Sequence, residues 1–198
     1  LRSALNDMGF DYVVNEGDGA FYGPKIDFHL EDSIGRTWQC GTIQLDFQLP
    51  LNFELEYTDE NNEKQRPIMI HRVCYGSIER FIGVITEHFA GAFPTWLSPV
   101  QVKILTVTER ADEYAGQIAA KLDAAGFRAE TDLRNEKIGK KIREATLSKT
   151  PYMLVLGDRD IENQTVSVRH RSGEDLGAMT YAEFEALLAE EVKTKGIK

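Results

Sequence analysis

The sequence predicts an α+β first half, built mainly on antiparallel strands, followed by an α/β second half. Runs that alternate apolar and polar residues, separated by turns, characterise residues 1–97 and are typical of antiparallel strands with one buried face. Strands that alternate with helices characterise residues 98–198 and indicate a layered domain of roughly 100 residues. The Pro-bearing connector 91–99 separates the two patterns, so we place the domain boundary between residues 97 and 98.

Four runs in the first half are interpreted as strands, over residues 25–30, 38–47, 52–66 and 67–70. A turn at 32–35 joins the first two strands, and a polar turn at 59–62 divides the third. Gly41 interrupts the second strand and indicates either a bulge or the close approach of a ligand. The fourth strand leads directly into His71.

A helix is expected to begin at Ser77, and it carries an arginine in its first turn. Ser77 is a good N-cap, and apolar residues recur at helical spacing from residue 78 to residue 89. Arg80 therefore lies at the positive end of the helix dipole, where a cation typically costs about 0.3–1 kcal/mol unless an anion offsets it. Two interpretations follow: a phosphate site, because helix N-termini and guanidinium groups both bind phosphate, or an ion pair with Glu79 or Glu87.

The second half is expected to contain, in order, a strand over 100–107, a helix over 109–125, a strand over 127–133, a helix over 138–148, strands over 152–156 and 165–171, and a last helix ending near residue 193. Gly126 is the expected C′ residue of the first helix. The run 152–156 is continuously apolar, the pattern of a strand buried on both faces. A turn at 162–164 pairs the last two strands, and Thr180 with Glu183 forms a capping box for the last helix.

Polar residues recur on strand faces of the first half that the alternation excludes from the core: Lys25, Asp27, Gln39, Thr42, Gln44 and Asp46, with His71 and Arg80 following. One antiparallel sheet with a ligand-facing polar side explains all of them, and a solvent-exposed face is the alternative. Gln, Thr and a partly buried Lys suit nucleotide and amino-acid recognition, so we favour the site. His71 alone is weak evidence for a metal, because a metal needs several ligands. The turn at 21–24 brings two aromatic residues that suit either a core or a ligand lid.

In the second half, the run 134–137 closes a strand at the edge where open α/β sheets bind ligands. The side-chain amide of Asn135 can pair with a base edge, and Lys137 and Arg143 can meet phosphates. Asp160 and Arg169 are expected to come near the same edge. The alternative is that the basic helix 138–148 is simply a solvated face.

Charge is distributed unevenly along the chain. The formal net charge of −9 argues against nucleic-acid binding by the chain as a whole. Residues 1–99 carry 7 basic and 15 acidic side chains, whereas residues 100–198 carry 16 and 17. Within the second half, residues 134–149 hold six basic and two acidic side chains, a local net charge of +4. Because exposed charges beyond roughly 10 Å are screened, such a patch can still attract phosphates.

Cysteine usage and hydropathy indicate an ordinary cytoplasmic protein. Cys40 and Cys74 are the only cysteines and lack metal-type spacing, so we expect both to be reduced thiols. No stretch is apolar over the length needed to span a bilayer, and the first residues do not resemble a signal peptide. We therefore expect no membrane association and a cytoplasmic location.

Four segments together resemble one known family. Gly76-Ser77-Ile78-Glu79-Arg80-Phe81 resembles motif 3 of the class II aminoacyl-tRNA synthetases, whose arginine meets ATP phosphates. Residues 19–26, 38–47 and 132–139 narrow the resemblance to the bacterial threonyl-tRNA synthetases of class IIa. The four segments occur in the right order, and the resemblance covers essentially the whole chain.

The resemblance implies a fold and a set of site residues. Residues 1–97 would be the C-terminal part of the class II antiparallel sheet, and 98–198 the class IIa anticodon-binding α/β domain with a mixed sheet. The implied roles are catalysis by Arg80 and Lys25, ATP binding by Gln39, Thr42, Ser77 and Arg80, threonine binding by Tyr22 and Gln44, metal binding by His71, and anticodon binding by Asn135, Lys137, Arg143, Asp160 and Arg169.

The resemblance also implies substrates and partners. They are ATP with Mg²⁺, L-threonine, threonine tRNA, and a second subunit in the homodimeric full-length enzyme. The implied zinc would bind the amino and hydroxyl groups of threonine. Valine has the same shape but lacks the hydroxyl group, so this contact discriminates against it better than shape alone. His71 is one of its three protein ligands, and the other two, together with motifs 1 and 2, would lie upstream of Leu1. We therefore expect a fragment that does not form threonyl-adenylate by itself.

Two other functions compete with this interpretation. A chain with an anticodon domain and a remnant catalytic sheet can act as a stand-alone tRNA-binding or regulatory module. A class IIa synthetase of another specificity, such as proline, is a weaker alternative, because His71 and the segment 39–44 match the threonine pattern.

Overall fold

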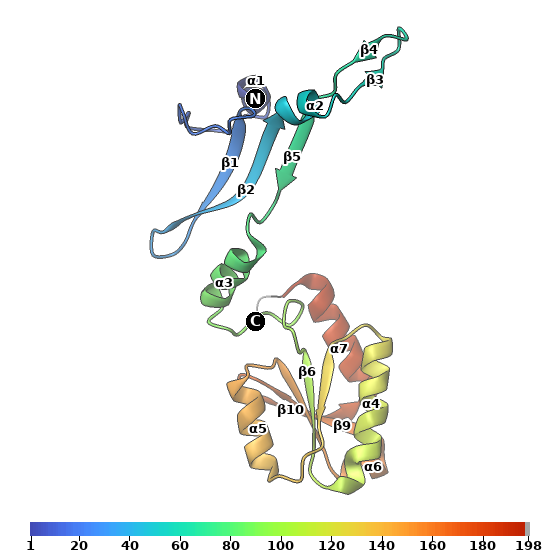
Figure 1. Cartoon of the computed structure of the whole chain (residues 1–198). Coiled ribbons are helices and arrows are strands. Elements are labelled where there is room, and N and C mark those ends of the chain that lie inside the picture. Colours follow the sequence, from blue (N-terminus) through green and yellow to red (C-terminus); the bar gives the residue numbers. More distant parts are fainter. Residues whose placement is uncertain (197–198) are drawn as a thin grey trace. The chain divides into compact units, whose positions relative to one another are not determined.

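The computed structural model describes residues 1–196, which form two compact units, Leu1–Ile85 and Thr86–Lys198 (Figure 1). Each unit has its own sheet, and no strand pairs across the division. No helix of the described residues is both long and apolar enough to cross a membrane. The predicted domain boundary at residues 97/98 stays a prediction.

The first unit is built on a three-stranded antiparallel sheet in the order β1-β2-β5 (Figure 1). Its strands are β1 (Lys25–Glu31), β2 (Thr37–Asp46) and β5 (Met69–Val73). Its other elements are α1 (Arg2–Asp7), α2 (Gln48–Asn52), the short hairpin of β3 (Tyr57–Thr58) and β4 (Lys64–Gln65), and the start of α3 (Ile78–His88). The predicted antiparallel sheet and helix are confirmed.

A β-bulge lies where Gly41 interrupts β2. Phe28 pairs with Gly41, but His29 pairs with Gln39, so Cys40 is the extra residue. A Cβ atom at position 41 would lie 3.1 Å from the Phe28 ring and 3.4 Å from the carbonyl oxygen of Val73. The bulge predicted at this glycine is confirmed, and the close approach comes from the neighbouring strands.

The prediction of strands over 52–66 is largely wrong. Only two residues on each side of the turn pair as β3 and β4, and α2 precedes them. The helix α2 begins where the Asp46 carboxylate accepts hydrogen bonds from the backbone N–H groups of Gln48 and Leu49. The short helix α1 was not predicted from the sequence.

The second unit is built on a five-stranded mixed sheet in the order β10-β9-β8-β6-β7. Its strands are β6 (Val102–Thr106), β7 (Ala129–Asp132), β8 (Tyr152–Leu156), β9 (Thr165–His170) and β10 (Asp175–Thr180). Its helices are η1 (Glu109–Ala111), α4 (Asp112–Ala124), α5 (Ile138–Leu147), α6 (Asp158–Asn163) and α7 (Tyr181–Thr194). The strands β7, β6 and β8 are parallel, and β9 and β10 are antiparallel, so the predicted α/β fold with a mixed sheet is confirmed.

Two apolar clusters pack on opposite faces of this sheet. The larger cluster joins the sheet to α4 and α7, and the smaller one joins it to α5 (Figure 1). Leu154 belongs to the larger cluster and Met153 to the smaller, so β8 is buried on both faces, as its continuous apolar run predicts.

Two elements of the second unit were not predicted. The expected turn at 162–164 is the end of α6, where Gln164 adopts a left-handed conformation with φ of 55°. The edge strand β10 follows β9 through a tight turn and has a glycine-containing irregularity at Gly177. The capping box at the start of α7 is confirmed, because Thr180 N donates to Glu183 Oε2 and Glu183 N donates to Thr180 Oγ1.

Candidate functional site

Predicted site residues of the first unit share one face of its sheet. Lys25 on β1 pairs with Gln44 on β2, and Gln44 pairs with His71 on β5. Two residues farther along β1, Asp27 pairs with Thr42 of β2. Directly paired residues point to the same side of a sheet, so these side chains form adjacent rows across its polar face.

Asp27 is the centre of a hydrogen-bond network on this face. Its carboxylate lies 2.6 Å from Lys25 Nζ and accepts hydrogen bonds from Gln39 Nε2 at 2.7 Å and Thr42 Oγ1 at 2.8 Å. Burial alone would raise the pKa of Asp27, but these partners, Lys25 first, lower it overall. The hydrogen bond to Asp27 raises the pKa of Lys25, against the effect of burial. Both groups are therefore charged at neutral pH, and Asp27 fixes Gln39 and Thr42.

Tyr22 and Gln44 lie next to each other at the same face. The Tyr22 hydroxyl donates to Gln44 Oε1 at 2.9 Å, so among the described residues the Gln44 amide nitrogen keeps its donors free. The turn that positions Tyr22 requires Gly23, because a Cβ atom there would lie 2.2 Å from the carbonyl oxygen of Leu45. The Tyr22 ring also meets the His71 ring edge-on, with centroids 5.9 Å apart.

His71 is oriented by a buried carboxylate. Its Nε2 lies 2.8 Å from Oδ2 of Asp46, a fully buried residue. Burial would raise the pKa of Asp46, but the hydrogen bond from His71 and those from two backbone N–H groups lower it overall. The described residues contain no group of three His, Cys, Asp or Glu side chains that could hold a metal ion. His71 with its nearest neighbours therefore does not fit a complete zinc site.

Arg80 extends from the first turn of α3. The preceding loop passes close to β2, because a Cβ atom at Gly76 (φ +63°) would lie 2.9 Å from the carbonyl oxygen of Cys40. Ser77 Oγ accepts from Arg80 N at 3.4 Å and donates to Glu79 at 2.9 Å. The Arg80 side chain is exposed and makes no hydrogen bond or ion pair within residues 1–196. Glu79 instead accepts from Ser77, so within the first unit no ion pair between Arg80 and Glu79 forms.

In the second unit, the loop over 133–137 lies at the carboxyl ends of β6 and β7. Asn135 and Lys137 are exposed in this loop, and Arg143 is exposed on α5. No side-chain hydrogen bond or ion pair occupies these three residues within the described part of the chain. They are therefore available to a ligand, as the sequence predicts.

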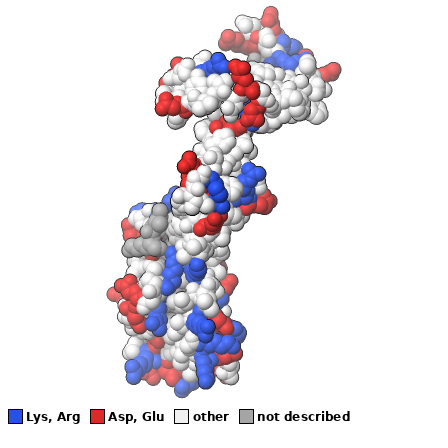
Figure 2. Space-filling model, turned by 90° about the vertical axis from the view of Figure 1, so that its left-hand side faces the viewer, with Lys and Arg blue, Asp and Glu red and all other residues white. Residues whose placement is uncertain are grey.

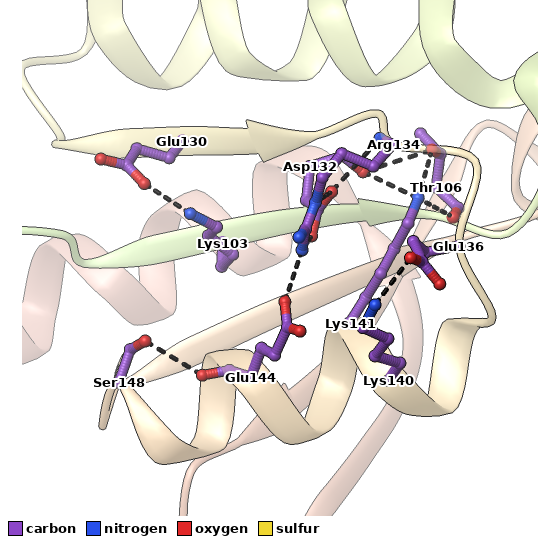
Figure 3. A network of polar contacts seen from close by, with 10 residues as sticks. All are labelled: Lys103, Thr106, Glu130, Asp132, Arg134, Glu136, Lys140, Lys141, Glu144 and Ser148. Carbon is purple, nitrogen blue, oxygen red and sulfur yellow. Dashed lines mark hydrogen bonds and ion pairs between the residues drawn. The ribbon is translucent and has the colours of Figure 1, made fainter.

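Arg134, which the same motif contains, is exposed but is paired with two carboxylates of the protein (Figure 3). Its Nε and Nη2 meet the two oxygens of Asp132 at 2.9 and 2.6 Å, and Nη2 also meets Glu144 Oε2 at 2.6 Å. The hydrogen bonds from Arg134 lower the pKa of Asp132 to about 2. Arg134 is therefore a brace beneath the loop rather than a free phosphate ligand.

Asp160 and Arg169 lie in different places. Asp160 is buried at the start of α6, beside the carboxyl end of β8, and its carboxylate accepts from Gly157 N and Ser167 Oγ. Arg169 pairs with Met153 near the opposite end of β8, so the expectation that it lies at the loop edge is wrong. The antiparallel direction of β9 places it there. Anticodon contacts by both residues stay predictions.

Basic side chains gather on one face of the second unit. Figure 2 shows Lys and Arg side chains, with Asp and Glu between them, on the face of this unit that carries α5. Residues 134–149 hold six basic side chains, of which Lys141 is buried and the other five are exposed. The local positive patch predicted on an acidic chain is therefore a surface feature of this unit.

Two families match the two units. Residues 2–89 match the tRNA synthetase class II core domain (G, H, P, S and T), and residues 101–191 match the anticodon binding domain. The solved RNA binding domain of threonyl-tRNA synthetase from Cryptosporidium parvum superimposes with a TM-score of 0.83 and 42% identity, over 96% of this chain and 48% of that one. A putative threonyl-tRNA synthetase from Aeropyrum pernix gives a TM-score of 0.65 and 30% identity, over 98% of this chain and 47% of that one.

Curated relatives point the same way. The threonine–tRNA ligase of Syntrophomonas wolfei is 63% identical over 195 residues, and that of Acetivibrio thermocellus is 62% identical over 195 residues. Each match covers 98% of this chain but 31% of the relative, so the chain spans about a third of the length of these proteins. With both a class II core domain and an anticodon binding domain, the chain belongs to the class II aminoacyl-tRNA synthetase family, among relatives that are threonine–tRNA ligases.

Proposed function

We propose that this chain forms part of a threonine–tRNA ligase, which activates L-threonine with ATP and transfers it to threonine tRNA. The observation that carries the proposal is the polar sheet face of the first unit. It joins the Lys25, Gln39 and Thr42 network to the adjacent pair Tyr22 and Gln44. One surface thus offers donors for a nucleotide beside donors for a small polar amino acid.

The proposed reaction has two steps. The threonine carboxylate attacks the α-phosphorus of ATP, which forms threonyl-adenylate and releases pyrophosphate. A terminal hydroxyl of the tRNA then attacks the acyl carbon and releases AMP. We assign Arg80 to the ATP phosphates, because its unpaired guanidinium at the start of α3 complements negative charge that Mg²⁺ only partly neutralises. Lys25, held by Asp27, stabilises charge beside the reacting carboxylate.

Threonine selection is assigned to Gln44, Tyr22 and His71. The free amide donors of Gln44 suit the oxygens of the amino acid, and Tyr22 fixes their direction. A zinc ion at His71 would require ligands beyond those that the described residues supply, so no step of the proposal uses zinc. Specificity for threonine rather than proline rests on the match of residues 39–44 and on the curated relatives.

The second unit is assigned to the anticodon. Asn135 reads a base edge, and Lys137 and Arg143 meet phosphates, because all three are exposed and unpaired within residues 1–196. Arg169 and Asp160 complete the proposed set. Asp160 contributes by joining the start of α6 to β9 through its carboxylate. We further propose a homodimer in the full-length enzyme and a cytoplasmic location.

The binding of threonine tRNA to this chain tests the assignment. Asn135→Ala and Arg169→Ala should each weaken binding by about 5- to 150-fold, which corresponds to roughly 1–3 kcal/mol for a lost base contact. Lys121→Ala is the matched control, because Lys121 lies on α4, on the opposite face of the sheet, and should change little. Wild-type affinity and anticodon preference in both variants would contradict the assigned roles.

Pyrophosphate exchange tests the catalytic part. We expect no threonine-dependent exchange from this chain alone, because it spans about a third of the length of the curated threonine–tRNA ligases that it matches. Exchange at enzyme-like rates would contradict this expectation. Tight tRNA binding without exchange is the expected combination, and it is also what a stand-alone tRNA-binding module would show. Exchange by a longer chain that includes this one separates the two.

A further inference from the structure

Lys141 is the most unusual side chain of the second unit, because it is buried with only uncharged partners. The residue is 2% exposed. Its Nζ donates to the Thr106 carbonyl oxygen at 2.9 Å, to Thr106 Oγ1 at 3.3 Å and to the Asp132 carbonyl oxygen at 3.0 Å (Figure 3). Lysine is almost never fully buried unless it is paired. All three donors of the ammonium group are used here.

The acceptors lie at the ends of two neighbouring strands. Thr106 is the last residue of β6, and Asp132 is the last residue of β7. The strands are parallel and pair up to Leu105 and Asp132, so regular pairing stops where Lys141 begins to bridge them. The ammonium group thus links β6 and β7 at the point where their backbone hydrogen bonds end.

The loop 133–137 is fixed at both ends by this arrangement. It leaves β7 at Asp132 and enters α5 at Ile138, and Lys141 reaches back from α5 to the point where the loop starts. On the outer side, the Asp132 carboxylate holds Arg134, which in turn holds Glu144 on α5. The pKa of Asp132 falls to about 2, mainly through Arg134 and with a contribution from the charge of Lys141, so the brace stays ionised at neutral pH.

Burying an ammonium group that has no direct carboxylate partner costs several kcal/mol, and a packed apolar side chain would avoid that cost. A purely structural explanation is therefore incomplete. The apolar neighbours of Lys141 on α5, including Ile142 and Ala145, already supply the packing. What the ammonium group adds is a fixed direction for two strand ends and for the loop between them.

We propose that Lys141 is a positioning residue for RNA recognition, which holds the loop 133–137 in its binding conformation while it touches no RNA itself. The inference rests on the proposed anticodon-binding function and deepens it. Asn135 and Lys137 are exposed and make no side-chain hydrogen bond or ion pair within the described residues, so the path of the loop backbone largely sets their direction. A loop ordered in advance binds without the entropy cost of ordering it.

The test compares Lys141→Met with Lys103→Met in the full chain. Lys103 is the matched control: it also lies on this face of the sheet, but it pairs with Glu130 away from the loop. Affinity is measured for threonine tRNA and for transcripts with single anticodon substitutions, at a temperature at which circular dichroism shows every variant folded. Lys141→Met should bind threonine tRNA about tenfold more weakly and lose most of its discrimination between anticodons. Lys103→Met should retain both.

A double-mutant cycle with Asn135→Ala separates positioning from stability. In the Lys141→Met background, Asn135→Ala should cost much less than in the wild type, because the loop no longer aims the amide. Additive effects, or wild-type affinity and discrimination in folded Lys141→Met, would overturn the inference.

Lys141→Arg covers the case in which Lys141→Met does not fold. It keeps the charge, but a planar guanidinium cannot place its donors on the same three oxygens. The same selective loss of anticodon discrimination is expected, and unchanged discrimination overturns the inference. Failure of the wild-type chain to bind any tRNA would instead overturn the proposed function, and this inference with it.

Discussion

Four aspartates organise the residues that were expected to bind ligands. Asp27 fixes Gln39 and Thr42, and Asp46 orients His71. In the second unit, Asp132 holds Arg134, and Asp160 accepts a hydrogen bond from Ser167. Each accepts two or more hydrogen bonds, and hydrogen bonds to an ionised carboxylate are about twice as strong as neutral ones. The functional surface thus depends on carboxylates that are themselves largely hidden.

Asp132 makes the stability of the second unit depend on pH. Its pKa is about 2 in the folded state against an ordinary value of 3.8, so the folded state binds this proton more weakly than the unfolded state. Its contribution, about 2 kcal/mol, is complete above pH 4 and is lost as the pH falls toward 2.

Asp132→Asn should therefore unfold with a flatter pH dependence than the wild type between pH 4 and pH 2. Urea unfolding at several pH values measures the difference. Equal slopes for the two proteins would show that the Asp132–Arg134 pair contributes nothing to stability.

At the scale of elements, short polar signals decide where helices and turns begin. The carboxylate of Asp46 starts α2 directly after β2, and the capping box of Thr180 and Glu183 starts α7. Gly23 and Gly76 permit chain paths that approach β2 too closely for any side chain.

Thr180→Ala should destabilise the second unit by about 1 kcal/mol, because it removes the N-cap acceptor of α7. Thr194→Ala is the matched control: its hydroxyl bonds to a carbonyl oxygen of the preceding helical turn and caps nothing. Chemical denaturation measures both variants, and a smaller loss for Thr180→Ala than for Thr194→Ala would contradict the prediction.

Gly23→Ala should displace the turn that carries Tyr22, because its Cβ atom would overlap the Leu45 carbonyl oxygen. The hydrogen bond from Phe47 N to the Tyr22 carbonyl oxygen should open, and the Phe47 amide should exchange faster with solvent. At Gly19 the nearest atom to an added Cβ is 3.7 Å away, so Gly19→Ala should leave that exchange unchanged. Equal exchange in both variants would count against the prediction.

At the scale of the whole molecule, the apolar core belongs to the second unit. Apart from prolines, every buried apolar side chain of the described residues lies between Val102 and Leu188, and in the first unit the buried apolar residue is Pro50 of α2. The connector is also tied to the second unit: Thr95 donates to Glu191, and Arg128 donates to the carbonyl oxygens of Trp96 and Ser98.

A fragment of residues 91–198 should therefore unfold cooperatively, whereas a fragment of 1–90 should not. A shorter fragment of 102–198 should lose on the order of 2 kcal/mol or more, because it lacks the hydrogen bonds of the connector. Thermal unfolding monitored by circular dichroism compares the three fragments. Equal stability of the 91–198 and 102–198 fragments would show that the connector does not stabilise the second unit.

Local signals predicted most of the second unit, since α5, α7 and β8 follow from periodicity and capping residues. The sequence also predicted which polar residues of the first unit share a face. It did not predict α6 and β10, whose short runs form structure only against β8 and β9. A signal for Lys141 was present: residues 138, 141, 142 and 145 repeat at helical spacing, which places the lysine on the buried stripe of α5.

The sequence by itself determined the family, the two fold classes and the polar residues that share one face of the first sheet, because these depend on local patterns and motifs. Only the tertiary structure decided which charged residues are free and which are internal. Arg80, Asn135 and Lys137 have no side-chain partner within the described residues, whereas Arg134 is paired with Asp132 and Glu144 and Lys141 is buried. The physical reason is that a lysine or an arginine is chemically the same whether it is paired or unpaired. Only folding decides whether hydrogen-bond acceptors come within about 3 Å of its charged group.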